Sequence, residues 1–173
     1  MKAQNKHSQF EEIALPHLDA AFNLAYWLTG DRQDADDIVQ ESYLRAFKFF
    51  DSYRGGNSHA WLLAIVRNTT YTWMRQNRMN EGAVLLEEEL PDSEIVSLES
   101  SYLQQADFQR LREAIAALPV EYREVIVLHD LEGLAYKEIA SVANIPLGTV
   151  MSRLSRARDR LQKSLIDRQQ REA

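Results

Sequence analysis

The chain has 173 residues, no cysteine and a formal net charge of -6, and 45% of its residues are hydrophobic. This length suits one domain or two small ones, and the absence of cysteine excludes disulfides, thiolate zinc sites and a cysteine nucleophile. The sequence shows neither an apolar run of transmembrane length nor the apolar core of a signal peptide, so we expect a cytoplasmic protein with no direct membrane insertion.

Residues suited to catalysis or metal binding do not cluster in the sequence. The four histidines are scattered without ligand spacing. We find no nucleophile–base pair and no glycine-rich phosphate loop. The sequence therefore predicts no enzymatic activity, no cofactor and no metal.

Apolar residues recur every three or four positions through most of the chain, which predicts an all-α fold. One helix is predicted over residues 10–28, closed by Gly30, and a second over about residues 31–50. A loop follows, and Ser58 is the expected N-cap of the next helix.

Charge is distributed unevenly along the sequence. Residues 52–80 contain no Asp or Glu, and residues 81–107 contain no Lys or Arg. We therefore predict two small helical domains, residues 1–80 and 107–173, joined by a flexible acidic linker over residues 81–106. The linker is either a solvating spacer or an autoinhibitory segment that occupies basic surfaces of the free protein.

The C-terminal half is predicted to hold four helices, over residues 103–118, 120–131, 136–143 and 147–167. The last two resemble a helix-turn-helix, in which Asn144 occupies the turn because Asn tolerates left-handed backbone. The final helix places one apolar stripe inward, formed by Val150, Leu154, Ala157 and Leu161.

The opposite face of this final helix is rich in hydroxyl and guanidinium groups. By itself such a stripe is typical of a solvated surface. After a short helix and an Asn turn, it also suits insertion into a DNA major groove. The candidate residues are Thr149, Ser152, Arg153, Arg156 and Arg160.

Three stretches of the C-terminal half resemble a known protein family. GLAYKEIA and IPLGTVMSRLSRAR resemble region four of the sigma-70 family, especially its extracytoplasmic-function (ECF) group. LPVEYREVIVLHDLEGL resembles the helix that leads into that motif. The resemblance implies recognition of the minus-thirty-five promoter element by the final helix. One departure is Ala135, where the family commonly has Ser, so we expect the start of the next helix to lack an N-cap and to fray.

The stretch DADDIVQESYLRAFKFF places Asp37, Gln40 and Glu41 on one helical face. Taken alone, this is more typical of a solvated face. The stretch is similar to the ECF region-two helix that grips the clamp of RNA polymerase. The resemblance therefore implies that these three residues contact core polymerase.

The acid-free segment AWLLAIVRNTTYTWMRQNR lies where the family places its strand-separating, minus-ten-reading element. Captured single-stranded bases must offset lost stacking, and aromatic platforms contribute about 1–3 kcal/mol per base. Alternatively, its tryptophans pack the core, which we expect of at least one. The candidate minus-ten residues are Arg54, Trp61, Arg67, Asn68, Tyr71, Trp73, Arg75 and Arg78.

The resemblance predicts an ECF-type sigma factor that directs core polymerase to promoters and helps to open the DNA. Its implied partners are the clamp and flap regions of core RNA polymerase, promoter DNA and an anti-sigma protein, which could also hold it at the membrane. Two alternatives are a helix-turn-helix regulator of the response-regulator type and an enzyme. The first would need a receiver or ligand-binding domain, which residues 1–80 do not suggest.

Overall fold

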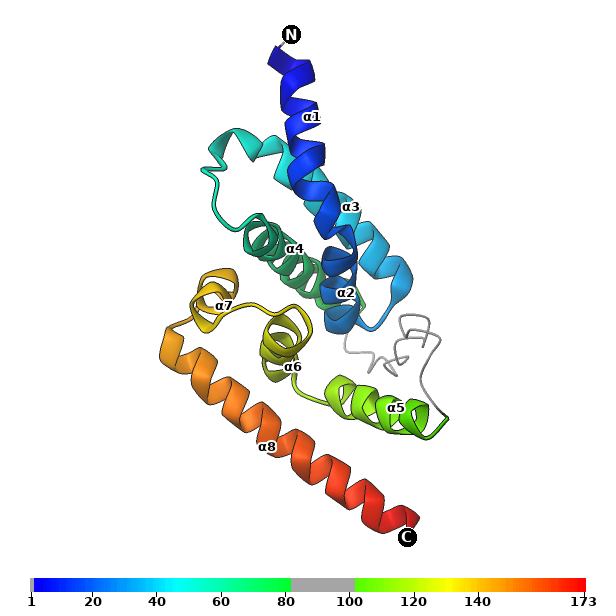
Figure 1. The fold of residues 1–173 in the computed structure, drawn as a ribbon. Coiled ribbons are helices and arrows are strands. Elements are labelled where there is room, and N and C mark those ends of the chain that lie inside the picture. Colours follow the sequence, from blue (N-terminus) through cyan, green and yellow to red (C-terminus); the bar gives the residue numbers. More distant parts are fainter. Residues whose placement is uncertain (1, 82–101) are drawn as a thin grey trace.

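The computed structural model describes residues 2–81 and 102–173. Every regular element in these two stretches is helical, which confirms the predicted all-α fold. Helices α1 to α4 form an N-terminal bundle and α5 to α8 a C-terminal bundle (Figure 1). Their bounds are α1 Lys2–Ala14, α2 Leu18–Thr29, α3 Arg32–Lys48, α4 Ser58–Glu81, α5 Tyr102–Ala116, α6 Val120–Ile126, α7 Tyr136–Ala143 and α8 Leu147–Glu172.

The prediction of a single helix over residues 10–28 is wrong. The chain forms α1 and α2, separated by the 3-10 turn Leu15–His17. Pro16 lies in this turn, and proline breaks a helix because it lacks an N–H and crowds the preceding turn. The carbonyl of Ala14 at the break accepts a 2.7 Å hydrogen bond from the Tyr43 hydroxyl. Burial, with a smaller contribution from Asp19, raises the pKa of Tyr43 to about 12.

The turn between α2 and α3 forms as predicted. Gly30 ends α2 with φ of 76°, a conformation that glycine adopts without a steric penalty. Asp31 then caps α3, since its Oδ1 accepts the backbone N–H of Asp34 at 2.9 Å. This turn places the first residues of α3 on the surface.

The start of α4 differs from the prediction by one residue. Asn57 provides the cap, because its Oδ1 accepts the backbone N–H of Ala60 at 3.1 Å. The expected N-cap Ser58 instead lies 2.9 Å, Oγ to Nε2, from His17 in the turn after α1. The prediction failed because Asn and Ser are equally good caps and stand next to each other here.

The N-terminal core lies between α2, α3 and α4. Leu24, Ile38 and Leu62 come from these three helices and are each at most 1% exposed. Burial of one stripe of α4 fixes which of its side chains point away from this core. The remaining stripe of α4 contains the arginines of the candidate minus-ten segment.

The helix-turn-helix predicted in the C-terminal half is present. Helix α6 continues into a π-helical turn over Val127–Leu131, and α7 and α8 follow. Asn144 joins α7 to α8 in the left-handed conformation, with φ of 54° and ψ of 50°. On α8 the predicted inner stripe is buried at Val150, Leu154 and Ala157, while its fourth member, Leu161, is only partly buried.

The start of α7 has a hydrogen bond that the sequence analysis did not foresee. Ala135 offers no side-chain oxygen, as expected. Glu138 in the first turn of α7 nevertheless accepts the backbone N–H of Ala135 at 3.0 Å. This bond is one half of a capping box. It therefore satisfies one backbone N–H at the start of α7, although the side-chain cap that a Ser would provide is missing.

The two bundles lie against each other. Helix α4 packs on α7, and α2 packs on α6, so α6 and α7 lie between α8 and the N-terminal bundle (Figure 1). The buried Arg123 of α6 donates from Nη1 to the carbonyl of Trp27 in α2 and from Nη2 to that of Leu118, both at 2.9 Å. The bond from Arg123 to Trp27 therefore links the two bundles, in addition to the packing of their helices.

The predicted linker falls largely on residues 82–101, which lie outside the described residues. Helix α5 begins at Tyr102, one residue before the predicted start. Among the helices of the described stretches, none combines the length and the apolar character needed to cross a membrane.

The left-handed turn at Asn144 predicts a specific stability change. A β-branched residue in this conformation costs about 1–2 kcal/mol, so Asn144→Val should lower the free energy of unfolding by about that amount. Asn144→Gly is the control and should change stability little, because glycine adopts this conformation freely. Urea unfolding followed by circular dichroism measures both, and equal stabilities for the two variants would contradict the argument.

Candidate nucleic-acid interface

The candidate polymerase-contact residues lie together on α3. Asp37, Gln40 and Glu41 are all exposed, although α3 also supplies Ile38 to the core. Glu41 forms an exposed 2.8 Å ion pair with Arg45 one turn further along the helix. This face is a hydrated acid–amide surface that a partner can reach while the bundles are docked.

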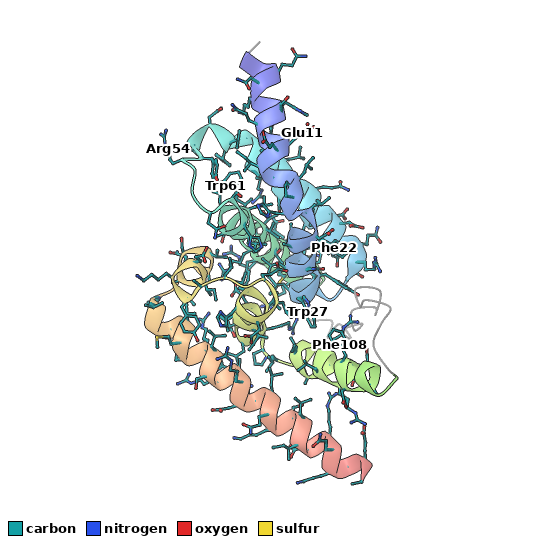
Figure 2. All side chains as sticks on the ribbon, viewed as in Figure 1. Glu11, Phe22, Trp27, Arg54, Trp61 and Phe108 are labelled. Carbon is teal, nitrogen blue, oxygen red and sulfur yellow. The ribbon has the colours of Figure 1, made fainter. Side chains whose placement is uncertain are left out.

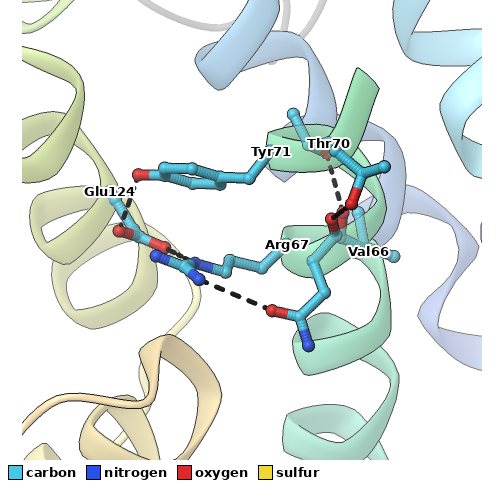
Figure 3. Close-up of polar contacts among 7 residues, drawn as sticks. Val66, Arg67, Thr70, Tyr71 and Glu124 are labelled. Atoms are coloured by element: carbon cyan, nitrogen blue, oxygen red, sulfur yellow. Dashed lines mark hydrogen bonds and ion pairs between the residues drawn. The ribbon is translucent and has the colours of Figure 1, made fainter. Parts of the chain in front are cut away.

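The candidate minus-ten segment is central to the junction between the bundles. Arg67 Nε lies 2.5 Å from Oε1 of Glu124, which belongs to α6 (Figure 3). The hydroxyl of Tyr71 donates to Oε2 of the same carboxylate at 2.9 Å. The Arg67 guanidinium also lies 3.9 Å from the centre of the Tyr71 ring. One carboxylate of the C-terminal bundle thus engages two candidate DNA residues of α4.

The electrostatics of this cluster follow from burial and from charge pairing. The Glu124 side chain is 0% exposed and that of Arg67 17% exposed. Burial disfavours the charged form of Arg67, but the hydrogen bond and charge of Glu124 outweigh it and raise the pKa of Arg67. Burial, followed by the charge of Glu124, also raises the pKa of the Tyr71 hydroxyl. At neutral pH the cluster is a buried ion pair with a neutral phenol.

Two more carboxylates of the C-terminal bundle contact the beginning of α4. His59 Nε2 lies 3.3 Å from Oε2 of Glu132, which follows the π-helical turn. The Asn57 amide donates to Glu138 of α7. His59 stacks on His17 with ring centres 5.1 Å apart, and burial together with His59 lowers the pKa of His17.

The other polar candidates of this segment face solvent. Asn68, Arg75 and Arg78 are exposed, and Asn68 Oδ1 lies 3.5 Å from Arg67 Nη1. Arg54 is exposed and projects from the loop between α3 and α4 (Figure 2). These side chains are therefore open to solvent, whereas Arg67 and Tyr71 are held inside the junction.

The two tryptophans of α4 are partly buried, and both pack against the hydrophobic core. The Trp61 ring centre lies 4.8 Å from that of Tyr53 and 6.3 Å from that of Phe50. Trp61 is therefore at least a structural support of the loop that carries Arg54. Trp73 lies toward the C-terminal half of α4 and is likewise packed on the core.

The predicted major-groove residues lie along one side of α8. Ser152 and Arg156 are exposed, while Thr149 and Arg153 are partly exposed. Arg160 is exposed at one end of this surface, with its guanidinium 5.0 Å from the ring centre of Tyr122. The inner stripe packs on α6 and α7, so this row stays on the surface.

Sequence reasoning missed Glu124, Glu132 and Glu138. The only signal for Glu124 was its place directly before the apolar run of residues 125–128, since an acid beside a buried segment requires partners if it is itself buried. Its partners are 57 and 53 positions away, and no local pattern indicates contacts at such separations. Within the described residues, no group of three or more potential ligands is placed to hold a metal ion.

Comparison with known proteins covers both bundles. Residues 13–79 match the family model of Sigma-70 region 2, and residues 108–161 match that of Sigma-70, region 4. The chain is 33% identical to ECF RNA polymerase sigma factor SigE of Mycolicibacterium smegmatis, with 90% of this chain but only 61% of that protein covered. It is 32% identical to SigW of Bacillus subtilis, covering 91% and 89%, and 35% identical to EcfG of Rhodopseudomonas palustris, covering 86% and 78%.

Solved structures agree with these matches. The sigma factor RpoE of Bartonella quintana, solved in complex with the anti-sigma factor NepR, superposes with a TM-score of 0.78. It is 31% identical, and the match covers 91% of this chain and 96% of that one. CnrH, solved with the cytosolic domain of CnrY, shares the fold with a TM-score of 0.65 at 23% identity.

The aromatic packing of Trp61 predicts a stability effect. Trp61→Ala should lower the free energy of unfolding by about 2 kcal/mol, less than for a fully buried aromatic because Trp61 is only partly covered. Asn68→Ala on the same helix is the control and should change stability by no more than about 0.5 kcal/mol, since its side chain is exposed. Chemical unfolding of both variants tests this, and a Trp61→Ala variant as stable as the control would show that the indole is no structural support.

Proposed function

The chain belongs to the ECF group of the sigma-70 family of RNA polymerase sigma factors, and we propose that it directs core RNA polymerase to specific promoters and helps to open their DNA. A sigma factor is a transcription initiation factor, and we propose that this one performs no chemistry itself. The observation that carries the proposal is the order of two matched regions, each with an exposed polar face of the required chemistry.

In this proposal the N-terminal bundle binds polymerase through α3 and reads the minus-ten element through α4. The exposed face of Asp37, Gln40 and Glu41 suits a basic surface on the polymerase clamp. Residues 58–80 of α4 contain no acid, which suits a DNA strand because a carboxylate there would repel phosphates. Asn68 is the proposed reader of a flipped base, and Arg54, Arg75 and Arg78 are proposed backbone contacts.

The C-terminal bundle is proposed to bind the minus-thirty-five element through α8. Its row of hydroxyl and guanidinium groups is supported from behind by the buried stripe that begins at Val150. Arginine pairs bidentately with guanine or phosphate, so Arg153 and Arg156 are the proposed specificity residues. Arg160, near Tyr122, is a proposed phosphate contact.

We further propose an anti-sigma protein as a partner and the cytoplasm as the place of action. The similar RpoE structure contains the anti-sigma factor NepR, which supports the first point. The match of residues 13–79 to Sigma-70 region 2 also removes the reason for the response-regulator alternative, which needed a different N-terminal domain.

Reconstitution tests the proposal as a whole. Core polymerase should initiate at discrete sites on fragmented genomic DNA only when the purified chain is added, and sequencing of the transcripts should give shared upstream elements. Transcription that is the same with and without the chain would refute the proposed function.

The polymerase-contact face is tested by charge reversal. Asp37→Arg combined with Glu41→Arg should abolish co-purification with core polymerase without unfolding the protein, because exposed carboxylates contribute little to stability. The matched control is Glu12→Arg with Glu121→Arg, which reverses two exposed charges outside this face. Normal assembly of the first double variant would show that the face is only solvated.

The upstream contact surface is tested on α8. Removing the side chains of Thr149, Arg153 and Arg156 by alanine substitution should weaken the minus-thirty-five footprint, at about 1–3 kcal/mol for each base-directed contact. Polymerase binding should persist. The control changes Gln162, Lys163 and Arg171 to alanine, which removes as many cations from the other half of the same helix. Equal footprints for the two triple variants would contradict the assignment.

A further inference from the structure

The contacts between the bundles fall on one side of α4. Arg67 and Tyr71 are four positions apart and face α6, where both engage Glu124 (Figure 3). Asn68 and Arg75 lie within about 100° of Arg67 around the helix, on its exposed side. The candidate DNA stripe is therefore divided, with one half covered and the other half in solvent.

The covering groups have the chemistry of a nucleic-acid backbone. Glu124, Glu132 and Glu138 approach α4 from the C-terminal bundle and contact residues between Asn57 and Tyr71. At 1.5 Å per residue, these contacts extend along about 21 Å of chain at the helix axis. Carboxylates and phosphates are both oxyanions that accept hydrogen bonds from guanidinium groups. The C-terminal bundle thus presents a row of carboxylates to the side of α4 where a bound DNA strand would present its phosphates.

The Glu124 contact is the most buried of the three. Its side chain is 0% exposed, against 11% for Glu132, so solvent and salt screen it least. In the docked state Arg67 neutralises this carboxylate, and the ring of Tyr71 lies against the guanidinium rather than against a base. When the bundles separate, both Glu124 and Arg67 become accessible to water or to another partner.

We propose that Glu124 is an internal competitor of DNA, whose pairing with Arg67 and Tyr71 holds the free protein closed and denies α4 to a DNA strand. The proposal rests on the proposed function in taking α4 as the DNA-facing helix. The docking itself does not depend on that assignment. In this proposal the C-terminal bundle supplies the competing anions, and the predicted role of the acidic linker stays untested because it lies largely outside the described residues.

The first test removes one charge from the junction in the full chain. Glu124→Gln removes the anion that Arg67 pairs with in the closed state, whereas in the open state Arg67 is hydrated and loses nothing. The population should therefore shift to the open state. Anisotropy with a fluorescein-labelled single strand of mixed sequence should show about tenfold tighter binding, the gain expected when the closed state loses about 1.4 kcal/mol. The matched control is Glu121→Gln, an exposed acid on the same helix. Equal affinities for the two variants would overturn the proposal.

The second test measures the separation of the bundles directly. The chain has no native cysteine, so Lys48→Cys and Ser155→Cys place spin labels on exposed sites of α3 and α8 alone. Pulsed electron resonance should give one distance for the otherwise unchanged protein and an added longer one for Glu124→Gln. If Glu124→Gln fails to fold, Tyr71→Phe removes only the hydroxyl donor and should produce a smaller shift in the same direction. Unchanged distances would again overturn the proposal.

The third test locks the junction. His59→Cys with Glu132→Cys, joined by a short bis-methanethiosulfonate reagent, should prevent binding of the labelled strand until a reductant cleaves the link. Equal binding by the linked and the reduced protein would refute internal competition and leave the proposed function intact. If the wild-type chain instead supports no promoter-directed transcription with core polymerase, the proposed function fails, whatever the distances show.

Discussion

A carboxylate with no exposed surface lies at the junction on which the arrangement of the two bundles is built. Glu124 is fully buried on α6, and a buried charge is tolerated only where it is paired and hydrogen-bonded. Both of its partners, Arg67 and Tyr71, lie on a helix of the other bundle. In the docked state these two partners satisfy the buried carboxylate, and the same docking brings Glu132 and Glu138 to the beginning of α4. When the bundles separate, water replaces these contacts, because an exposed carboxylate and an exposed guanidinium are both readily hydrated.

The absence of acids from residues 52–80 has two physical reasons in this arrangement. A carboxylate on the exposed side of α4 would repel the phosphates of the proposed DNA ligand. A carboxylate on the covered side would stand against the glutamates of the C-terminal bundle, where like charges in a partly buried junction are costly. In the proposed scheme the same composition therefore serves an internal anionic surface and the external DNA, and the two compete because both use Arg67 and Tyr71.

The sequence predicted local features well and long-range ones poorly. Gly30, Asn144 and the inner stripe of α8 were predictable because each depends on one residue's backbone preference or on helical periodicity. The break at Pro16 was predictable in principle, since proline inside a helical pattern signals an interruption, but the apolar periodicity on both sides concealed it. The pairing of Arg67 with Glu124 was not predictable, because burial of that acid could have been satisfied by many cations. The candidate face of α8 came from helical periodicity and side-chain chemistry, while the roles of the candidates on α3 and α4 came from the family resemblance, and all of these roles stay predictions.

The two faces of the N-terminal bundle differ in accessibility, and in the proposed scheme this difference gives an order of binding. Asp37, Gln40 and Glu41 are exposed while the bundles are docked, whereas Arg67 and Tyr71 are held by Glu124. In the proposed scheme a polymerase can therefore engage the closed protein through α3 before DNA can reach all of α4. A partner shifts a conformational equilibrium only by as much as it prefers one state, so polymerase must also bind the C-terminal bundle in a position incompatible with docking. If it does, Arg67 exchanges a carboxylate of its own chain for a phosphate only at the polymerase, and the free factor makes little unproductive contact with DNA.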